Sequence, residues 1–274
     1  MIHPTAIVAE GARIGQGVHI GPYTVIDGNV TVGDHCRIGP HVYITGTTRI
    51  GAHTRIHKGA DIGDEPQDHS FEGQESYTEI GAHCVLREYV TIHRGSEPGT
   101  TTRLGDHVMM MGFSHAGHNC VLGDHVVVAN ATLLAGHVTV EDRGFISGGV
   151  LVHQFVRIGT TAMIGGGARV PQDVPPYCMV VHGEVQGPNV VGLRRAGLPP
   201  ANRKAVRAAL KLLYFNGLNR TEALAEIGAQ HNAVPEVAHL VEFVQDSRRG
   251  IMPGRRPRST SDPHGAPTRD ESAE

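Results

Sequence analysis

An aliphatic side chain recurs at every sixth position of this chain, and this period constrains the fold more than any other feature. The pattern is unbroken over residues 2–62 and returns over 80–92 and 104–170, where Ala116 takes one of its positions. A period of six fits neither an α-helix nor a plain strand, and it is typical of a parallel β-helix. Three hexads would form one triangular coil of about 18 residues. Successive coils would stack about 4.8 Å apart.

The hexads also predict which side chains fill the interior of the coils. Each aliphatic residue would point to the axis, together with the small or β-branched residue four positions later. Cys36, Cys84 and Cys120 hold that small position and Cys178 lies beyond the last repeat, so we interpret all four as reduced packing residues. Glycine follows many of the aliphatic residues, and we expect these glycines to supply the positive φ of tight corners.

Composition excludes several classes of function. Charged residues make up 19% of the chain and the formal net charge is −3, which provides no general basic field for nucleic acid. No stretch approaches the roughly 20 apolar residues of a membrane span, and the repeat starts at the N-terminus without a signal segment. We therefore expect a cytoplasmic protein with no integral membrane segment. No Cys-x-x-Cys spacing indicates a metal, and we expect no bound cofactor.

The periodicity divides the chain into three parts. We expect a β-helix over 1–190, with loops near 64–78 and 94–103 that leave it on one side. A helical pattern replaces the hexads over 191–252, where Thr221 could cap one of the helices. Residues 253–274 contain few apolar side chains, so we expect a disordered tail.

The 19 histidines fall into two groups. One group follows a Gly-Asp or Gly-Ala pair at a fixed hexad position, as turn residues do: His35, His53, His83, His107 and His125. The second group clusters in later coils. In coils of about 18 residues, His118, Gly136 and Gln154 would form one column on successive turns. A second column would stand beside it: Asn119, His137 and Phe155.

Two interpretations of the first column remain open. Histidine can accept a proton from a hydroxyl in a transition state. The backbone N–H of Gly136, one coil away from His118, could then bond an oxyanion on an attacked carbonyl. No serine or cysteine nucleophile is evident beside these residues, which favours direct transfer over a covalent intermediate. The alternative is a stack of surface histidines that solvates a turn.

Six motifs occur in a fixed order and point to one family. They are Thr-Ile-His-Arg-Gly at 91–95, His-Ala-Gly-His at 115–118, Leu-Ala-Gly-His at 134–137, Val-His-Gln-Phe at 152–155, Gln-Asp-Val-Pro-Pro-Tyr at 172–177 and Asn-Val-Val-Gly-Leu-Arg-Arg at 189–195. In this series the chain resembles the acyl-carrier-protein-dependent UDP-N-acetylglucosamine O-acyltransferases of lipid A synthesis. The resemblance covers residues 1 to about 250. Hexads alone are shared with many acetyltransferases, so the motif series is the specific signal.

The resemblance implies a left-handed parallel β-helix with a small C-terminal helical domain, assembled as a homotrimer with sites between subunits. It implies that His118 is the general base for the 3-hydroxyl of UDP-N-acetylglucosamine, and that Gly136 N–H is the oxyanion donor. The acyl donor would be a 3-hydroxyacyl thioester on the phosphopantetheine of acyl carrier protein. The family pattern assigns substrate contacts to Gln67, Asp68, His93, His115, His137, His153, Gln154, Asn189 and Arg195.

Two further roles follow from the resemblance or from charge. A small residue at Gly166 is associated in the family with longer acyl chains. Basic residues gather near the start of the helical segment: Arg194, Arg203, Lys204 and Arg207. Acyl carrier protein is acidic, so this cluster could steer and orient it. A solvated helix face is the alternative interpretation.

Three residues depart from the family pattern. Ser70 stands where a lysine is usual, Asn119 replaces the aspartate after the catalytic histidine, and Val191 replaces a glutamate. The missing cation leaves open whether the sugar is UDP-N-acetylglucosamine or a 3-amino analogue. An amide oxygen at residue 119 could still fix the tautomer of His118, but it would stabilise an imidazolium less than a carboxylate does.

Other functions fit the hexads alone. An N-acyltransferase on a UDP-amino sugar and a small-acyl transferase that uses acetyl-CoA are the enzymatic alternatives. A non-catalytic scaffold or binding module is the alternative from another class. A zinc site with three histidine ligands is also known on such coils. The order of the motifs favours the O-acyl reaction over all of these.

Overall fold

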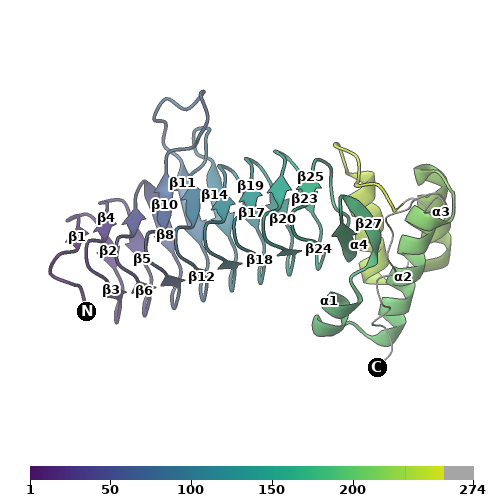
Figure 1. Ribbon diagram of the computed structural model, residues 1–274, viewed down its shortest axis with the longest axis horizontal. Coiled ribbons are helices and arrows are strands. Elements are labelled where there is room, and N and C mark those ends of the chain that lie inside the picture. Colours follow the sequence, from purple (N-terminus) through teal and green to yellow (C-terminus); the bar gives the residue numbers. More distant parts are fainter. Residues whose placement is uncertain (232, 256–274) are drawn as a thin grey trace, which may run out of the picture.

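The computed structural model describes residues 1–231 and 233–255 and shows a left-handed parallel β-helix with helices at its C-terminal end (Figure 1). Each coil contributes one short strand to each of three sheets. Residues 18 apart pair across successive coils, as in Val8 with Ile26 and Ile26 with Ile44. The six-residue period therefore predicts both the fold and its register.

The three sheets run the length of the β-helix. The first contains β1 (Ile7–Val8), β4 (Val25–Ile26), β7 (Tyr43–Ile44), β10 (Asp61–Asp64), β13 (Thr91–His93), β16 (His115–Ala116), β19 (Leu133–Leu134), β22 (Leu151–Val152) and β25 (Arg169–Val170). The second contains β2 (Arg13–Ile14), β5 (Thr31–Val32), β8 (Thr47–Ile50), β11 (Tyr77–Ile80), β14 (Thr101–Leu104), β17 (Val121–Leu122), β20 (Thr139–Val140) and β23 (Arg157–Ile158). The third contains β3 (His19–Ile20), β6 (Arg37–Ile38), β9 (Arg55–Ile56), β12 (Val85–Leu86), β15 (Met109–Met110), β18 (Val127–Val128), β21 (Phe145–Ile146), β24 (Met163–Ile164), β26 (Cys178–Val181) and β27 (Glu184–Pro188).

The interior is aliphatic, as the hexads predict. Ile26, Ile44 and Ile62 are fully buried on the axis. The small positions are buried as well, and the four cysteines are free and buried. Burying an aliphatic side chain stabilises a fold by about 1.5 to 3 kcal/mol. A column with one such residue on every face of every coil therefore accounts for the rigidity of the scaffold.

The expectation that glycines supply positive φ at the corners is wrong for most of the glycines that directly follow the aliphatic residues, with Gly63 (φ of 82°) as an exception. The positive φ lies two positions later and belongs mostly to larger residues, such as His107 and His125 with φ of 59°. The glycines are needed because neighbouring coils approach closely. A Cβ on Gly123 would lie 2.2 Å from Asp142 Oδ1 and 2.8 Å from Asp142 N.

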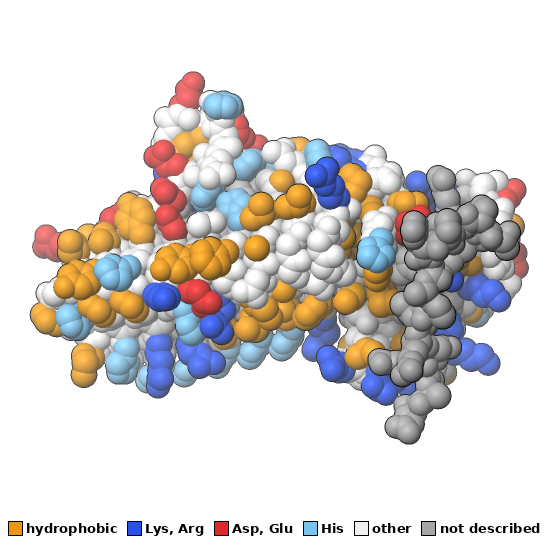
Figure 2. Space-filling model, in the orientation of Figure 1, with side chains coloured by type: hydrophobic (Ala, Val, Ile, Leu, Met, Phe, Trp, Pro, Cys, Tyr) orange, Lys and Arg blue, Asp and Glu red, His pale blue; other side chains and the backbone are white. Residues whose placement is uncertain are grey.

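Two insertions leave the β-helix where a strand of the first sheet ends. The first spans 65–76, between β10 and β11, and the second spans 94–100, between β13 and β14. Their bounds are narrower than predicted because Tyr77 and Thr101 already pair with each other in the second sheet. Figure 1 shows the insertions projecting from one side of the β-helix. Figure 2 shows acidic side chains on this projection.

Four helices follow the last strand. They are α1 (Val190–Arg195), α2 (Pro200–Phe215), α3 (Arg220–His231) and α4 (Pro235–Gln245). Helix α3 begins before Thr221, and Asn219 caps it. Asn219 Oδ1 accepts from Glu222 N–H while the Glu222 carboxylate accepts from Asn219 N–H. This reciprocal pair satisfies two donors that a threonine at 221 would not reach.

The segment after α4 returns to the β-helix. Residue Gly254 bridges to Val185 of β27, and Arg255 N–H donates to Val185 O. Residues 253–255, predicted to be disordered, are therefore ordered, because the edge of β27 supplies their backbone partners. The rest of the predicted tail, 256–274, lies outside the described residues. Within the described part of the chain, no helix is both long and apolar enough to cross a membrane.

Candidate active site

The turns that follow β16, β19 and β22 bring the predicted column together. We call these turns the site corner, and they comprise 117–119, 135–137 and 153–155. His137 N–H donates to His118 O at 2.9 Å, and Phe155 N–H donates to Gly136 O at 3.2 Å. His118 and Gly136 therefore stand on adjacent coils, as the 18-residue spacing predicts.

The imidazole of His118 is buried and held from one side. Its exposed fraction is 6%, and Nδ1 lies 2.9 Å from Asn119 Oδ1. Since an amide oxygen can only accept, this contact places the proton on Nδ1 and leaves Nε2 as an acceptor. Nε2 faces Gly136, where an added Cβ would lie only 2.4 Å from it.

Gly136 offers a backbone donor beside that acceptor. The residue is buried, and its N–H has no hydrogen-bond partner within residues 1–231 and 233–255. A buried N–H without a partner is rare in folded proteins. A proton acceptor and a vacant amide donor thus lie next to each other on one surface.

These two groups open into a hollow of about 330 Å³. Its lining is part polar and part aliphatic: Gln67, His93, His115, Gly117, His118, Leu133, Leu134, Ala135, Gly136, Leu151, Val152 and Gln154. Of the predicted substrate contacts, it unites Gln67, His93, His115 and Gln154. The motifs did not identify Leu133 and Leu151, which face outward on the first sheet and carry no polar signal.

Two further histidines of the hollow are neutral at pH 7. Burial, together with the smaller effect of the adjacent His93, lowers the pKa of His115 to about 4. Burial also lowers the pKa of His93. The His115 Nδ1 lies 2.7 Å from Thr91 Oγ1, whereas His93 Nδ1 is buried with no partner in the described chain. His93 therefore has a buried ring nitrogen whose hydrogen-bonding capacity is unused within the described residues.

The first insertion brings a carboxylate to His118. Asp68 Oδ2 lies 3.8 Å from His118 Nε2. Ser70 donates to Asp68 Oδ1 from both N–H and Oγ–H, each at 2.9 Å, and these bonds lower the pKa of Asp68. Ser70 thus favours the ionised form of Asp68 near the hollow.

The second insertion brings two residues that the motifs did not identify. Ser96 donates from N–H and from Oγ–H to Asn119 Oδ1, each at 3.0 Å. Glu97 Oε2 accepts from Asn119 Nδ2 at 3.1 Å, and its Oε1 lies 3.7 Å from His137 Nε2. Burial lowers the pKa of His137, and Glu97 opposes that shift. The sequence identified the loop, but nothing in its pattern singled out these two residues.

The remaining predicted contacts lie elsewhere on this single chain. His153 is exposed and does not line the hollow. Asn189 and Arg195 line a second hollow of about 360 Å³, which Val191 also lines. Gly166 is exposed in a turn that follows the third sheet. The structure thus does not bring Asn189, Arg195 or Gly166 to the first hollow within one subunit, whereas His153 lies in the site corner without lining that hollow.

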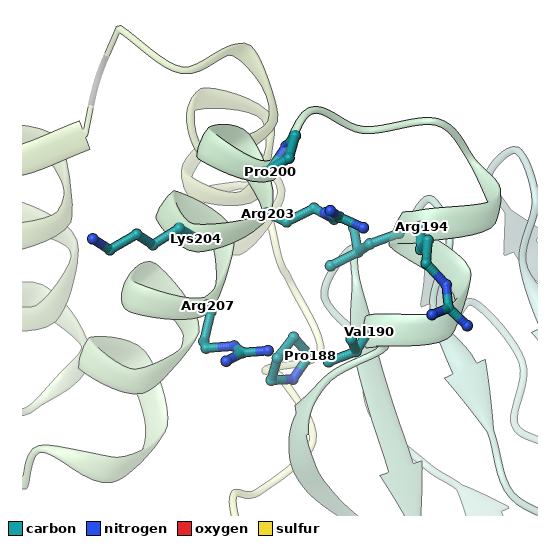
Figure 3. A pocket seen from close by; sticks show the side chains of 8 residues that line it. Pro188, Val190, Arg194, Pro200, Arg203, Lys204 and Arg207 are labelled. Atoms are coloured by element: carbon teal, nitrogen blue, oxygen red, sulfur yellow. The ribbon is translucent and has the colours of Figure 1, made fainter. Parts of the chain in front are cut away.

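The predicted basic cluster lines one hollow of about 390 Å³ between α1 and α2. Figure 3 shows Arg203 and Arg207 extending from α2 toward α1, while Lys204 extends the opposite way. Arg194 belongs to α1 at the same hollow. No group of three or more possible metal ligands occurs in the described residues.

Comparison with known proteins gives one consistent family. A family model described as Udp N-acetylglucosamine O-acyltransferase, domain 2, matches residues 173–252, and a bacterial transferase hexapeptide model matches 11–46. The chain is 54% identical over 254 residues to the acyl-[acyl-carrier-protein]–UDP-N-acetylglucosamine O-acyltransferase of Aquifex aeolicus, covering 91% of this chain and 97% of that protein. The protein of the same name from Sulfurihydrogenibium sp. is 52% identical over 255 residues, covering 92% and 94%.

Solved structures agree with these relatives. The crystal structure of LpxA, a UDP-N-acetylglucosamine acyltransferase from Bacteroides fragilis, superposes with a TM-score of 0.89 at 39% identity, covering 92% of this chain and 100% of that one. The Arabidopsis UDP-N-acetylglucosamine acyltransferase superposes with a TM-score of 0.82 at 36% identity, covering 92% and 100%.

Proposed function

The chain belongs to the UDP-N-acetylglucosamine O-acyltransferase family, and from this premise we propose its reaction. It transfers a 3-hydroxyacyl chain from acyl carrier protein to the 3-hydroxyl of UDP-N-acetylglucosamine, the first step of lipid A biosynthesis. One observation supports this most. His118 Nδ1 is bound by Asn119, and Nε2 faces the hollow beside the unpartnered Gly136 N–H.

His118 acts as the general base. Its Nε2 accepts the proton of the sugar hydroxyl while that oxygen attacks the thioester carbonyl. Gly136 N–H donates to the oxyanion of the tetrahedral intermediate. The carbon–sulfur bond then breaks, and the imidazolium returns its proton to the phosphopantetheine thiolate. The products are the O-acylated sugar nucleotide and the carrier protein with a free thiol.

The lining of the hollow suits both halves of the product. His93, His115, Gln154 and Gln67 offer polar contacts for the sugar. The side chains of Leu133 and Leu151 offer an apolar surface to the acyl chain. Asp68, His137 and His153 stand at its margin and complete the substrate contacts.

Asn189 and Arg195 serve a neighbouring subunit in this proposal. They share a second hollow, about 360 Å³ in volume, that does not include His118. A homotrimer in which this hollow meets the first one would complete each site between two subunits. Gly166, whose Cβ position is open on most sides, would then leave room for a longer acyl chain.

The acyl carrier protein docks at the helical end. Arg194, Arg203, Lys204 and Arg207 surround the hollow between α1 and α2, and their positive charge complements an acidic carrier. We assign 1–190 to the catalytic β-helix and 191–252 to this docking unit, and we place the enzyme in the cytoplasm, where carrier protein and sugar nucleotide are made.

A substrate panel tests the reaction. The protein is incubated with 3-hydroxyacyl carrier proteins of several lengths and with either UDP-N-acetylglucosamine or its 3-amino analogue. Turnover with the hydroxyl sugar supports the proposal. Turnover only with the amino sugar, or only with acetyl-CoA as donor, would assign the chain to one of the alternative transferases.

A further inference from the structure

The amide of Asn119 can face His118 in two orientations that are not equivalent, which would not be so for an aspartate. A carboxylate presents oxygen to His118 Nδ1 in either orientation, whereas an amide presents oxygen in one and NH₂ in the other. If the NH₂ faced Nδ1, the ring proton would move to Nε2 and the base would be lost. Something must therefore fix the orientation of this amide.

Residues of the second insertion fix this orientation by bonding both the oxygen and the nitrogen of the amide. The Asn119 oxygen accepts from Ser96 N–H, which can only donate. The Asn119 nitrogen donates to Glu97 Oε2, and an ionised carboxylate can only accept. We propose that Glu97 is a positioning residue, because its carboxylate holds the Asn119 amide with Oδ1 toward His118 Nδ1 and so keeps Nε2 free to accept a proton. This inference rests on the proposed role of His118.

The backbone around Glu97 is fixed, as a positioning role requires. Glu97 O accepts from Thr100 N–H at 3.1 Å and from Thr100 Oγ–H at 2.7 Å, while Glu97 N–H donates to Thr100 Oγ1 at 3.2 Å. Ser96 is buried, and its carbonyl accepts from the Gln74 side chain of the first insertion. Both insertions thus support the same amide.

Glu97 also supplies the charge that an amide lacks. Its second oxygen lies 3.7 Å from His137 Nε2, and the His137 ring meets the His118 ring edge to face at 5.1 Å. The Glu97 carboxylate contacts Asn119 and not His118 itself, but its charge can still stabilise the imidazolium that forms during transfer. Glu97 and Asn119 together would therefore do what a single aspartate does.

An exchange of charge tests the inference in the full-length enzyme. Asn119→Asp places two carboxylates against each other, so kcat should fall about 10- to 100-fold with little change in KM. Glu97→Gln in the same chain replaces the clash by an amide donor and should restore most of the loss. Glu97→Ala alone should lower kcat about tenfold, whereas Glu97→Gln alone, which keeps an acceptor, should lose less. Glu72→Gln, an exposed acid of the neighbouring insertion, is the matched control and should leave kcat unchanged.

A spectroscopic readout separates this inference from the proposed reaction. ¹⁵N NMR of histidine-labelled protein should show His118 protonated at Nδ1 in the wild type and a mixed tautomer in Glu97→Ala. A single Nδ1–H form in both proteins, or no restoration in the double variant, would overturn the role of Glu97 while leaving the base in place. Full turnover in His118→Ala would instead overturn the proposed reaction, whatever the tautomer shows.

Discussion

Two corners of the same β-helix share one backbone turn but differ in the contacts of their side chains. The ladder corner follows the second sheet and carries His35, His53, His83, His107 and His125. Its φ of 59° at His107 matches the 61° of Asn119 and the 60° of His137 in the site corner. The main chain is thus the same in both, and the difference lies in the side chains that meet between coils.

In the ladder corner, the carboxylate of an aspartate in one coil accepts a hydrogen bond from a backbone N–H of the preceding coil. Asp124 Oδ1 accepts from Asp106 N–H at 2.7 Å, and Asp142 Oδ1 accepts from Asp124 N–H at 2.9 Å. The exposed histidines beside them stack with ring centroids 4.7 to 5.1 Å apart. These contacts give the turn N–H groups of Asp106 and Asp124 partners within the chain.

In the site corner, the equivalent positions hold His118, Gly136 and Gln154. Among the residues that the structure describes, no carboxylate accepts from Gly136 N–H, and a buried imidazole occupies the space that a side chain at 136 would need. The site corner thus differs from the ladder corner in lacking the capping carboxylates, and both insertions leave from the site corner and stand beside its opening.

The difference between the two corners can be removed by giving the site corner a carboxylate like those of the ladder corner. Gln154→Asp places a carboxylate one coil after Gly136, where it can accept the Gly136 N–H as Asp142 accepts that of Asp124. Turnover should fall about 100- to 1000-fold, because the oxyanion donor is taken. Steady-state kinetics against Gln154→Asn, which keeps a neutral amide, isolates the effect. Equal activity of the two variants would show that this N–H is not used.

A smaller step in the same direction is Gly136→Ala. The added Cβ would overlap His118 Nε2 at 2.4 Å, so the ring must turn away from the hollow. We expect kcat to fall at least about tenfold with a melting temperature close to that of the wild type. Gly228→Ala, at a helical glycine without positive φ and with no neighbour within 4 Å of the added atom, is the control for stability. Unchanged kcat in Gly136→Ala would place the reacting atoms elsewhere.

Substitutions in the ladder corner should change the free energy of unfolding and not the rate of turnover. At its C-terminal end, Glu141 accepts from Thr160 N–H and pairs with His239 of α4 at 3.1 Å. The hydrogen bond to Glu141 raises the pKa of His239. Burial raises the pKa of Glu141, but the bonds from His239 and Thr160 outweigh it and leave that pKa below its usual value.

These shifts set a pH window. A raised histidine pKa stabilises the fold fully below about pH 6.5, and the effect is lost as pH rises through the folded-state pKa. A lowered glutamate pKa stabilises it above about pH 4.3, and the effect is lost as pH falls through the folded-state pKa. His239→Gln should therefore cost about 1 kcal/mol between these limits and less above neutrality. Denaturant unfolding across pH checks this, and a cost that grows with rising pH would refute it.

The smallest effect is expected within the stack itself. His107→Asn removes two ring contacts, to His83 and His125, but asparagine tolerates positive φ. The free energy of unfolding should fall by about 0.5 kcal/mol, because the rings are exposed, with kcat unchanged. A loss of turnover here would mean that the ladder corner is coupled to the reaction.

The sequence predicted the scaffold and the position of the first column because both follow from one period. The register of His118 over Gly136 is arithmetic once a coil holds 18 residues. The insertions disrupt that arithmetic. Thr54 and Cys84 of adjacent coils lie 30 positions apart, and Thr91 and His115 lie 24 apart. Glu97 and Ser96 lie within such an interruption, so no spacing could place them beside Asn119.

The role of glycine was mispredicted for a related reason. Positive φ and close approach of coils both favour glycine, and a sequence shows only the residue. The structure separates them, since a Cβ on Gly123 would collide with Asp142 while His125 takes the positive φ.

The most direct test of the account is the rate of acyl transfer in His118→Ala under single-turnover conditions, with circular dichroism to confirm the fold. The account predicts an intact β-helix and a loss of at least about 100-fold in the transfer rate. Transfer at the wild-type rate would contradict it.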